Sequence, residues 1–276
     1  MTAALPEDRT ADTAAPTPTI TLGPVPGHRK DETEGHPTRA AVGRPDPVSS
    51  PRPHRPGGHP ADLPPGTWPH LHDLTCWVGT WCFRSVLRVQ VHHADRIPAT
   101  GPVVLVANHS ALVDGPLLFG LTGRRGVFLV KREMFRGPLA WLLPRIGQLP
   151  VRRAAADATS LRAAADVLRG GGLVGVFPEG TRGIGDVTAA QHGAAWLART
   201  TGASVLPVAI RGTRRSPGGR RRLRPRVDVM VGAPLAVHHP SEHAGGGRAG
   251  LAAATETVRA ALAGLVVALD QVRSST

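Results

Sequence analysis

Short β-branched runs that alternate with helical segments are the feature that most limits how this chain can fold. Strands are predicted over residues 102–107, 126–130, 149–151, 173–177, 204–210 and 226–231. Helices are predicted over 116–121, 133–146, 155–168, 189–198 and 250–272, the second of them broken near its two prolines. Because strands and helices of this length alternate, we expect an α/β fold in which helices flank a largely parallel sheet.

Proline content changes sharply near residue 70. Fifteen of the 27 prolines lie in residues 1–69, where apolar residues follow no period of 2 or 3.6. Such a segment buries too little apolar surface to offset the entropy of ordering it. We therefore predict a disordered leader over 1–69 and a single folded domain over 70–276, with its core over about 95–235.

The net charge of the chain indicates what kind of partner it binds and says little about its fold. The chain has 33 Lys and Arg residues against 20 Asp and Glu, a formal net charge of +13. This surplus favours an anionic partner such as nucleic acid, a phosphorylated small molecule or an anionic lipid head group. Two cysteines exclude a disulfide framework. The chain has no apolar run of about 18 residues, and no apolar segment near Met1, so we expect neither a spanning helix nor a signal peptide.

Asn108-His109-Ser110-Ala111-Leu112-Val113-Asp114 directly follows the strand predicted over 102–107. On a continuous helix His109 and Asp114 would point about 140° apart, so they meet only across a non-helical turn. Gly115-Pro116 makes such a turn plausible. A paired imidazole and carboxylate could act as a general base and its orienting partner. Spacing alone favours the simpler interpretation, a turn histidine followed by a helix N-cap.

Phe177-Pro178-Glu179-Gly180-Thr181-Arg182 follows the strand predicted over 173–177. Gly180 permits close approach of the backbone, and Thr181 and Arg182 offer a hydroxyl and a guanidinium fork that matches a phosphate. The alternative is an ordinary turn with a surface ion pair between Glu179 and Arg182.

Cations also follow two other predicted strands. Lys131 comes after the strand over 126–130, and Arg152 comes after the strand over 149–151. If these strands are parallel neighbours, their cations and those of the 177–182 loop converge on one edge of the sheet.

These residues carry a resemblance to a known family. NHSALVD resembles the NHxxxxD motif of the glycerolipid acyltransferases, the 1-acylglycerol-3-phosphate acyltransferase-like family, and FPEGTR resembles that family's third motif. GQLPVRR and LPVAI are similar to its second and fourth motifs, and all four occur in family order within about residues 85–235. After Arg182 the family commonly has serine, where this chain has Gly183, and His192-Gly193 stands where it often has Lys-Gly.

The resemblance implies transfer of a fatty acyl group from acyl-CoA or acyl-carrier protein to the hydroxyl of a lysophospholipid acceptor, 1-acylglycerol 3-phosphate, giving phosphatidate. By motif match His109 would be the general base and Asp114 its partner. The remaining implied site residues bind the phosphorylated acceptor: Glu179, Gly180, Thr181, Arg182 and Arg152, with Lys131 on the same edge of the sheet. No acyl-enzyme, metal or prosthetic group is implied. The histidine pairs elsewhere lack the spacing of a zinc site.

A lipid substrate requires access to a membrane. Residues 74–91 combine tryptophan with arginine, so we expect an interfacial helix there and peripheral attachment to the cytoplasmic face of the cell membrane. Eight arginines lie between Arg211 and Arg226, which would favour an anionic membrane surface. Because that segment has no aromatic residue on which bases could stack, no nucleic acid is expected as partner. Both segments are also consistent with an ordinary packed helix and a solvated loop.

Two alternatives stay open from the sequence. The enzyme could acylate another lysolipid or glycerol 3-phosphate instead. The chain could also be a non-catalytic basic module that binds membrane or nucleic acid, in which case replacing His109 would leave its function unchanged.

Overall fold

The computed structural model describes residues 62–152, 158–180, 185–214, 223–237 and 247–275. Its helices and strands follow one another in the order α1 (Pro69–Val86), β1 (Arg88–His92), η2 (Ala94–Arg96), β2 (Val103–Ala107), α2 (Asp114–Leu121), β3 (Gly126–Lys131), η3 (Arg132–Met134), α3 (Pro138–Arg145), β4 (Leu149–Val151), α4 (Ala158–Arg169), β5 (Leu173–Val176), α5 (Gly193–Thr201), β6 (Ser204–Arg211), β7 (Arg226–Val231) and α6 (Arg248–Ser274).

These strands form one seven-stranded sheet in the order β1-β7-β6-β2-β5-β3-β4. Neighbouring strands are parallel except β6 and β7, which are antiparallel. All five residues of β2 are buried, as expected for a β-branched run at the centre of a parallel sheet. The α/β fold with a largely parallel sheet, predicted from the sequence, is confirmed.

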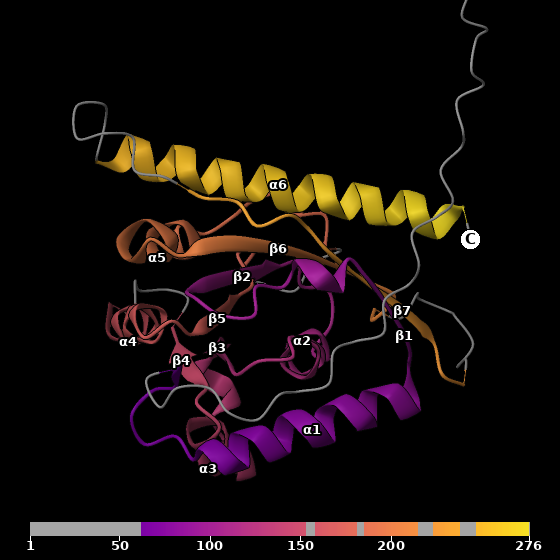
Figure 1. Cartoon of the computed structure of the whole chain (residues 1–276), viewed down its shortest axis with the longest axis horizontal. Helices are drawn as coiled ribbons and strands as arrows, with labels where there is room; N and C mark the ends of the chain where they lie inside the picture. Colours follow the sequence, from indigo (N-terminus) through magenta and orange to yellow (C-terminus); the bar gives the residue numbers. More distant parts are fainter. Residues whose placement is uncertain (1–61, 153–157, 181–184, 215–222, 238–246, 276) are drawn as a thin grey trace, which may run out of the picture. The chain divides into compact units, whose positions relative to one another are not determined.

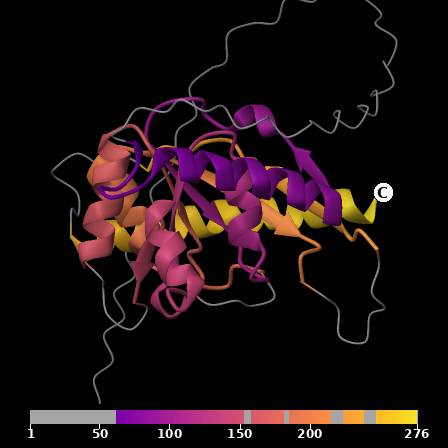
Figure 2. The same ribbon diagram turned by 90° about the horizontal axis from the view of Figure 1, so that it is seen from below.

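Helices cover both faces of the sheet (Figure 1). Alternate residues of β2 supply the two cores, because successive side chains of a strand point to opposite faces. Val104 and Val106 pack in a cluster with α4 and α5, whereas Val103 and Leu105 pack in a second cluster with α2. Helix α1 lies across α2 on that second side (Figure 2).

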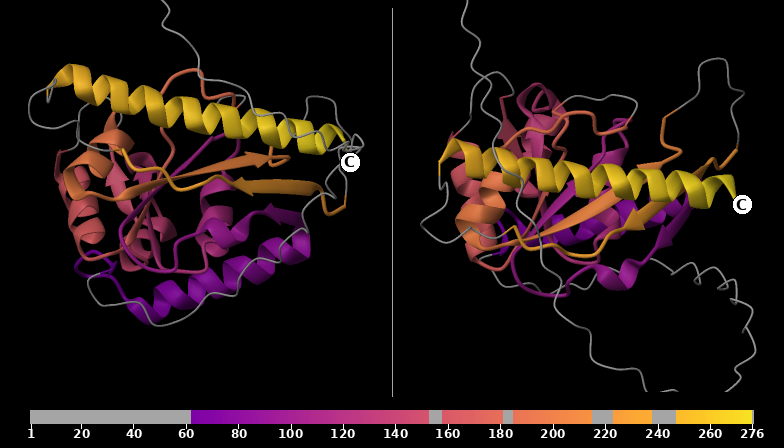
Figure 3. Two further views of the ribbon diagram at one scale, coloured as in Figure 1. Left: turned by 45° about the horizontal axis from the view of Figure 1, so that its top comes forward. Right: turned by 90° about the horizontal axis from the view of Figure 1, so that it is seen from above.

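Helix α6 runs along the opposite side of the sheet from α1 (Figure 3). Its buried side chains, including Val266 and Leu269, pack against Ala209 of β6 and Met230 of β7. Among the described residues, α6 is the one helix long and apolar enough to cross a membrane by length and composition. One side of it nevertheless forms part of the hydrophobic core.

The structure differs from the sequence prediction at the start of the domain. The helix predicted over 74–91 is α1, which ends at Val86, and residues 88–92 form β1 instead. The alternating valines of Arg88–His92 suit a strand, and this strand pairs with β7. Residues 62–68, placed in the leader by composition, are described and include the buried Leu63. The leader up to residue 61 lies outside the described residues.

Smaller differences concern helix bounds. The helix predicted over 133–146 is divided into η3 and α3, which begins at Pro138. The helix predicted over 189–198 begins only at Gly193. Pro138 suits the first turn of α3, where its missing N–H has no helical partner.

Candidate active site

The turn between β2 and α2 brings an imidazole and a carboxylate together. His109 Nδ1 lies 3.2 Å from Asp114 Oδ2, and the Asp114 side chain is fully buried. The same oxygen accepts hydrogen bonds from the backbone N–H groups of Ser110 at 2.8 Å and Ala111 at 2.7 Å. Asp114 is the first residue of α2, yet its side chain bonds backward to the turn. The carboxylate therefore fixes both the turn and the ring.

Those contacts decide which ring nitrogen is basic. A carboxylate only accepts hydrogen bonds at neutral pH, so Nδ1 of His109 carries the proton and Nε2 keeps its lone pair. Phe177 stacks on the ring, with centroids 4.3 Å apart and planes at 27°. The stacked phenyl group shields one face of the imidazole from water. Nε2 is thus held as a hydrogen-bond acceptor in a fixed orientation.

Asn108 continues the sheet with its side chain. Its Oδ1 accepts a hydrogen bond from the Ile210 N–H at 2.7 Å, and its Nδ2 donates to the Ile210 carbonyl at 2.9 Å. The backbone pairing of β2 with β6 ends one residue earlier, at Ala107. Because the buried amide replaces the ladder bonds, the main chain is free to turn away at His109.

A second turn, which follows β5, supports the first. The N–H of Gly180 donates to the Phe177 carbonyl at 3.2 Å, and Gly180 has a φ of +66°, which favours glycine. This turn directs the Glu179 carboxylate at the His109 backbone, whose N–H donates to Oε1 at 2.9 Å. Burial raises the pKa of Glu179 above its usual 4.5, and the bond from His109 acts in the opposite direction.

The chain beyond residues 181–184 is held at two successive positions, Gly185 and Asp186. The Gly185 carbonyl accepts hydrogen bonds from Asn108 and Arg211, and the Arg211 guanidinium also pairs with Asp186 at 2.9 Å. Arg211 reaches α6 as well, through Asp270 at 2.8 Å. A Cβ on Gly185 would lie 2.8 Å from Asn108 Nδ2, so only glycine fits there. The loop is consequently fixed to β2, β6 and α6.

The next residue of that loop is also constrained. Val187 has a φ of +53°, which is rare for a β-branched residue, and its side chain is fully buried. Its carbonyl accepts a hydrogen bond from Arg259 of α6. Strain of this kind persists only where the surroundings enforce it, which indicates that the end of the 177–187 loop is rigid.

Cations meet at the ends of β3 and β4, which are parallel neighbours. A surface cavity of about 800 Å³ opens there, lined by four cations, one carboxylate and two apolar residues: Lys131, Arg132, Arg136, Arg152, Glu133, Phe135 and Pro150. Lys131 and Arg152 thus lie at the ends of neighbouring parallel strands, whereas Arg182, the third cation expected at this edge, lies outside the described residues. Lys131 also lies 3.5 Å from Glu133.

Strand register places this cavity level with His109. Leu105 of β2 and Phe128 of β3 both pair with Gly175 of the intervening β5. His109 lies four residues beyond Leu105, just after β2, and Lys131 lies three beyond Phe128, as the last residue of β3, so both stand at the carboxyl ends of their strands. Neighbouring strands are about 4.8 Å apart, which puts the two backbones about 10 Å from one another.

Several predicted residues cannot be placed. Thr181 and Arg182, together with Gly183, lie outside the described residues, as do residues 215–222 of the arginine-rich segment between Arg211 and Arg226. His192 is described, and its Nδ1 lies 2.9 Å from Thr255 Oγ1 of α6. Where the family often has a lysine, this chain therefore makes a contact with the C-terminal helix.

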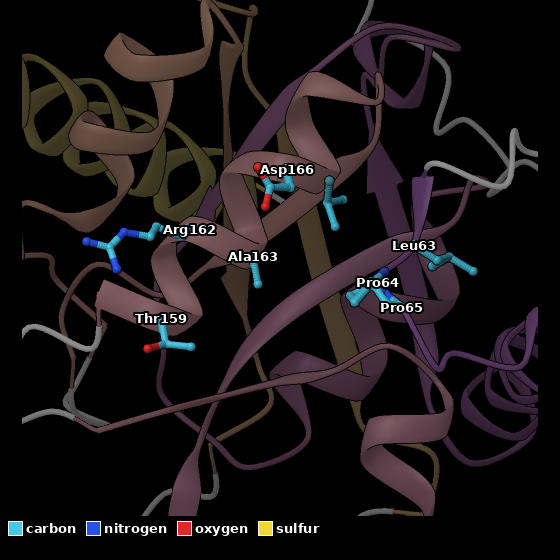
Figure 4. Close-up of a pocket in the computed structure, with 8 residues that line it drawn as sticks. Leu63, Pro64, Pro65, Thr159, Arg162, Ala163 and Asp166 are labelled. Atoms are coloured by element: carbon cyan, nitrogen blue, oxygen red, sulfur yellow. The ribbon is translucent and has the colours of Figure 1, made fainter.

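A further cavity lies apart from these residues. It has a volume of about 480 Å³ and lies between α4 and the segment before α1 (Figure 4), lined by Leu63, Pro64, Pro65, Thr159, Arg162, Ala163, Asp166 and Val167. None of the predicted site residues that the structure describes lines it. Across the described part of the chain, no three His, Cys, Asp or Glu side chains are grouped so that they could hold a metal ion.

Known proteins share the part of the sequence that forms this site. A sequence model described as Acyltransferase matches residues 88–211, the stretch that contains His109, Asp114 and the cationic cavity. The chain belongs to the acyltransferase family. This acyltransferase is 29% identical over 189 residues to the 1-acyl-sn-glycerol-3-phosphate acyltransferase of Bacillus subtilis, a match that covers 66% of this chain and 90% of that protein.

Other relatives match over shorter stretches. The 1-acyl-sn-glycerol-3-phosphate acyltransferase of Borreliella burgdorferi is 33% identical over 136 residues, covering 46% of this chain and 52% of its own length. The solved structure of the 1-acyl-sn-glycerophosphate acyltransferase PlsC from Thermotoga maritima has 27% sequence identity and a TM-score of 0.49, covering 70% of this chain and 77% of that one. The acyltransferase thus spans about half of one curated relative and most of another.

Sequence reasoning missed three residues that build the site. Asn108 and Phe177 stand inside the quoted motifs, so their position beside His109 could have singled them out. Arg211 directly follows the fourth motif, but its partners Asp186 and Asp270 lie 25 and 59 residues away. No local pattern points to contacts of that range.

Proposed function

We propose that this chain is a 1-acylglycerol-3-phosphate O-acyltransferase. It would transfer a fatty acyl group from acyl-CoA or acyl-carrier protein to the hydroxyl of 1-acylglycerol 3-phosphate, giving phosphatidate in phospholipid biosynthesis. The observation that carries the proposal is the pairing of His109 with buried Asp114 on the same sheet edge as a cavity lined by four cations. The names of the relatives support this acceptor.

The chemistry follows from the ring orientation. Nε2 of His109 takes the proton of the acceptor hydroxyl while the hydroxyl oxygen bonds to the thioester carbonyl carbon. Asp114 stabilises the resulting imidazolium through Nδ1. The tetrahedral intermediate then collapses, the carbon–sulfur bond breaks, and the imidazolium returns the proton to the departing thiolate. The thioester is already activated, so the reaction needs no covalent acyl-enzyme.

The cationic cavity would hold the phosphate. Lys131 ends β3, two strands from β2, and Arg152 follows β4, three strands from β2, so strand spacing puts their backbones about 10 Å and about 14 Å from that of His109. Their long side chains would meet the phosphate of an acceptor whose hydroxyl lies at His109. Charge-assisted contacts to phosphate contribute about 1.5–3 kcal/mol each. By motif match, Gly180, Thr181 and Arg182 complete the phosphate site, with Glu179 beside them. The contact of the Glu179 carboxylate with the His109 backbone would couple the loop after β5 to the catalytic turn.

Peripheral attachment to the cytoplasmic face of the membrane belongs to the same proposal. The exposed side of α1 carries apolar residues, including Leu74, Trp77 and Trp81. Residues buried on its other side include His72, Cys76 and Thr80. A helix that turns polar and small residues inward and large apolar ones outward suits a lipid interface better than water.

Thiol release tests the reaction. Purified full-length protein is incubated with long-chain acyl-CoA and either 1-acylglycerol 3-phosphate or the matching monoacylglycerol, which lacks the phosphate. We expect thiol release and phosphatidate with the first acceptor, and a rate lower by at least about tenfold with the second. Transfer to another lysolipid or to glycerol 3-phosphate, and not to 1-acylglycerol 3-phosphate, would show that the proposed acceptor is wrong. If the protein transfers no acyl group to any hydroxyl, the proposal is refuted.

A further inference from the structure

The cationic cavity at the ends of β3 and β4 holds more positive charge than one phosphate requires. Four cations against one carboxylate leave its lining with a surplus of three positive charges. A phosphate monoester carries a charge of only about −1.5 to −2 at pH 7. Lys131 and Arg152, at the strand ends, suffice for one such group. Arg132 and Arg136 are then available for a second anion.

Arg132 and Arg136 have no counter-ion within the described part of the chain. Both are exposed, and no carboxylate of the described residues pairs with either of them. By contrast Arg169, an exposed arginine of α4, lies 2.7 Å from Asp166. Two cations that line a cavity without neutralising partners raise the local concentration of anions there.

The position of these two arginines indicates how far the second anion lies from the reacting atoms. Arg132 begins η3, directly after β3, and Arg136 lies two residues beyond the end of η3. In lysophosphatidate the phosphate is attached to the carbon next to the one that bears the reacting hydroxyl. It therefore stays close to His109, and a group that meets Arg136 needs a longer connection to the reaction centre.

Acyl-CoA has a connection of this kind. Its pantetheine arm separates the thioester from an adenosine that carries a diphosphate and a 3′-phosphate. Guanidinium groups match phosphate oxygens in pairs, which makes arginine well suited to such a ligand. The second anion is thus expected on the donor and not on the acceptor.

The rest of the cavity lining suits a nucleobase. Phe135, which follows η3 and is half-buried, and Pro150 of β4 supply its apolar surface. Aromatic side chains stack on the flat face of any base. The volume of about 800 Å³ lies within the range of about 300–1,000 Å³ that is typical of pockets for small molecules and cofactors. A concave site of this size fits a nucleotide, whereas a folded carrier protein or a flat bilayer does not fill it.

We propose that the outer part of the cationic cavity binds the nucleotide end of acyl-CoA, with Arg132 and Arg136 on its phosphates and Phe135 stacked on its adenine. The inference rests on the proposed function, because the pantetheine arm must lead from this site to the acceptor hydroxyl at His109. It selects acyl-CoA over acyl-carrier protein as donor, since the arm of the carrier protein brings no nucleotide into the cavity.

Calorimetric titration with adenosine 3′,5′-bisphosphate tests the site without acyl transfer. The unaltered full-length protein is compared with Arg136→Gln, Phe135→Leu and the control Arg248→Gln, which changes an exposed arginine at the start of α6 that does not line the cavity. Inorganic pyrophosphate serves as a second probe, because it has the phosphates but no base.

We expect Arg136→Gln to weaken the binding of both probes by at least about tenfold. Phe135→Leu should weaken adenosine 3′,5′-bisphosphate by at least about fivefold and leave pyrophosphate unchanged, because only the first probe stacks. Arg248→Gln should change neither. If the unaltered protein does not bind adenosine 3′,5′-bisphosphate, or if Arg248→Gln weakens it as much as Arg136→Gln does, the proposal is overturned.

Kinetics with two donors assign the arginine to the donor. Thiol release is measured in uncharged detergent with acyl-CoA and with acyl-pantetheine, which lacks the nucleotide. Arg136→Gln should raise KM for acyl-CoA by at least about tenfold and leave KM for acyl-pantetheine and for 1-acylglycerol 3-phosphate unchanged. A rise in KM for the acceptor alone would overturn the proposal and place Arg136 in the acceptor site. A loss seen only with acyl-carrier protein, or only on anionic vesicles, would overturn it in favour of a protein or a lipid surface.

The two proposals fail in different ways. If the protein binds adenosine 3′,5′-bisphosphate through Arg136 but transfers no acyl group to any hydroxyl, the proposed function is refuted and the nucleotide site stands. If acyl-CoA and acyl-pantetheine are used with equal KM, the nucleotide site is refuted and the acyltransferase reaction stands.

Discussion

Replacing Asp114 with asparagine separates the electrostatic role of this carboxylate from its structural role. Oδ2 accepts hydrogen bonds from Nδ1 of His109 and from two backbone N–H groups of the turn. The amide oxygen of asparagine can keep the two backbone bonds, so the turn should survive. Alanine would leave two buried donors unsatisfied at about 1–3 kcal/mol each, a large part of a typical domain's stability.

The catalytic loss follows from the missing charge. The amide oxygen can still accept a hydrogen bond from Nδ1 of His109, but the neutral amide does not stabilise the imidazolium that forms during transfer. We therefore expect kcat to fall by about 10²–10⁴, which corresponds to about 2.7–5.5 kcal/mol of transition-state stabilisation. The midpoint of thermal unfolding should change by only a few degrees, because weaker backbone bonds are partly offset by removal of a buried charge.

Thiol release from acyl-CoA at saturating acceptor gives kcat, and circular dichroism gives the thermal midpoint. Asp166→Asn is the matched control, because Asp166 is an exposed α4 carboxylate paired with Arg169 and lies outside the catalytic turn. An Asp114→Asn protein that folds normally and keeps more than about a tenth of the activity would contradict this reading of the pair.

Three further predictions concern the surrounding residues. Glu179→Gln keeps an acceptor for the His109 N–H, whereas Glu179→Ala removes it and should cost about 1–3 kcal/mol of unfolding free energy. Because burial raises the pKa of Glu179, folding favours its protonated form, and the unaltered protein loses that stability as pH rises. Urea unfolding should therefore show Glu179→Gln gaining stability relative to the unaltered protein as pH rises above about 4.5. Arg211→Met should lower the unfolding free energy by about 1–3 kcal/mol and raise KM for the acceptor, since it releases the loop at Gly185; an unchanged KM would count against that link. Arg152→Gln should raise KM for lysophosphatidate by about 10–150-fold with a smaller effect on kcat, and Arg169→Gln on α4 serves as control; equal effects would argue against a phosphate site.

Most of the sheet could be predicted from the sequence because its central strands are uninterrupted apolar runs. β2 and β5 are buried on both faces, so no competing pattern obscures them. The contact of His109 with Asp114 was accessible from chemistry, although spacing alone favoured the simpler interpretation. Gly115-Pro116, expected to belong to the turn, lies in the first turn of α2, and the non-helical turn precedes it. β1 was missed because its five residues directly follow α1 and were assigned to the end of that helix, although Val89 and Val91 alternate as in a strand.

Other features depend on tertiary packing. The ion pairs of Arg211 join three elements far apart in the sequence. Of the eight arginines expected to attract lipid, Arg211 and Arg226 are engaged in ion pairs within the protein. The sequence also did not predict that α3 has no buried residue, because an apolar helix of eight residues is usually expected to pack in the core. The sequence identifies these arginines and this apolar helix, but only the packed structure shows what each of them contacts.

The most direct measurement compares the unaltered protein with His109→Ala in the thiol-release assay, using long-chain acyl-CoA and 1-acylglycerol 3-phosphate. A general base whose Nε2 accepts the hydroxyl proton predicts that kcat falls by about 10² or more while the thermal midpoint stays within a few degrees. A folded His109→Ala protein that forms phosphatidate at the original rate would contradict the central claim.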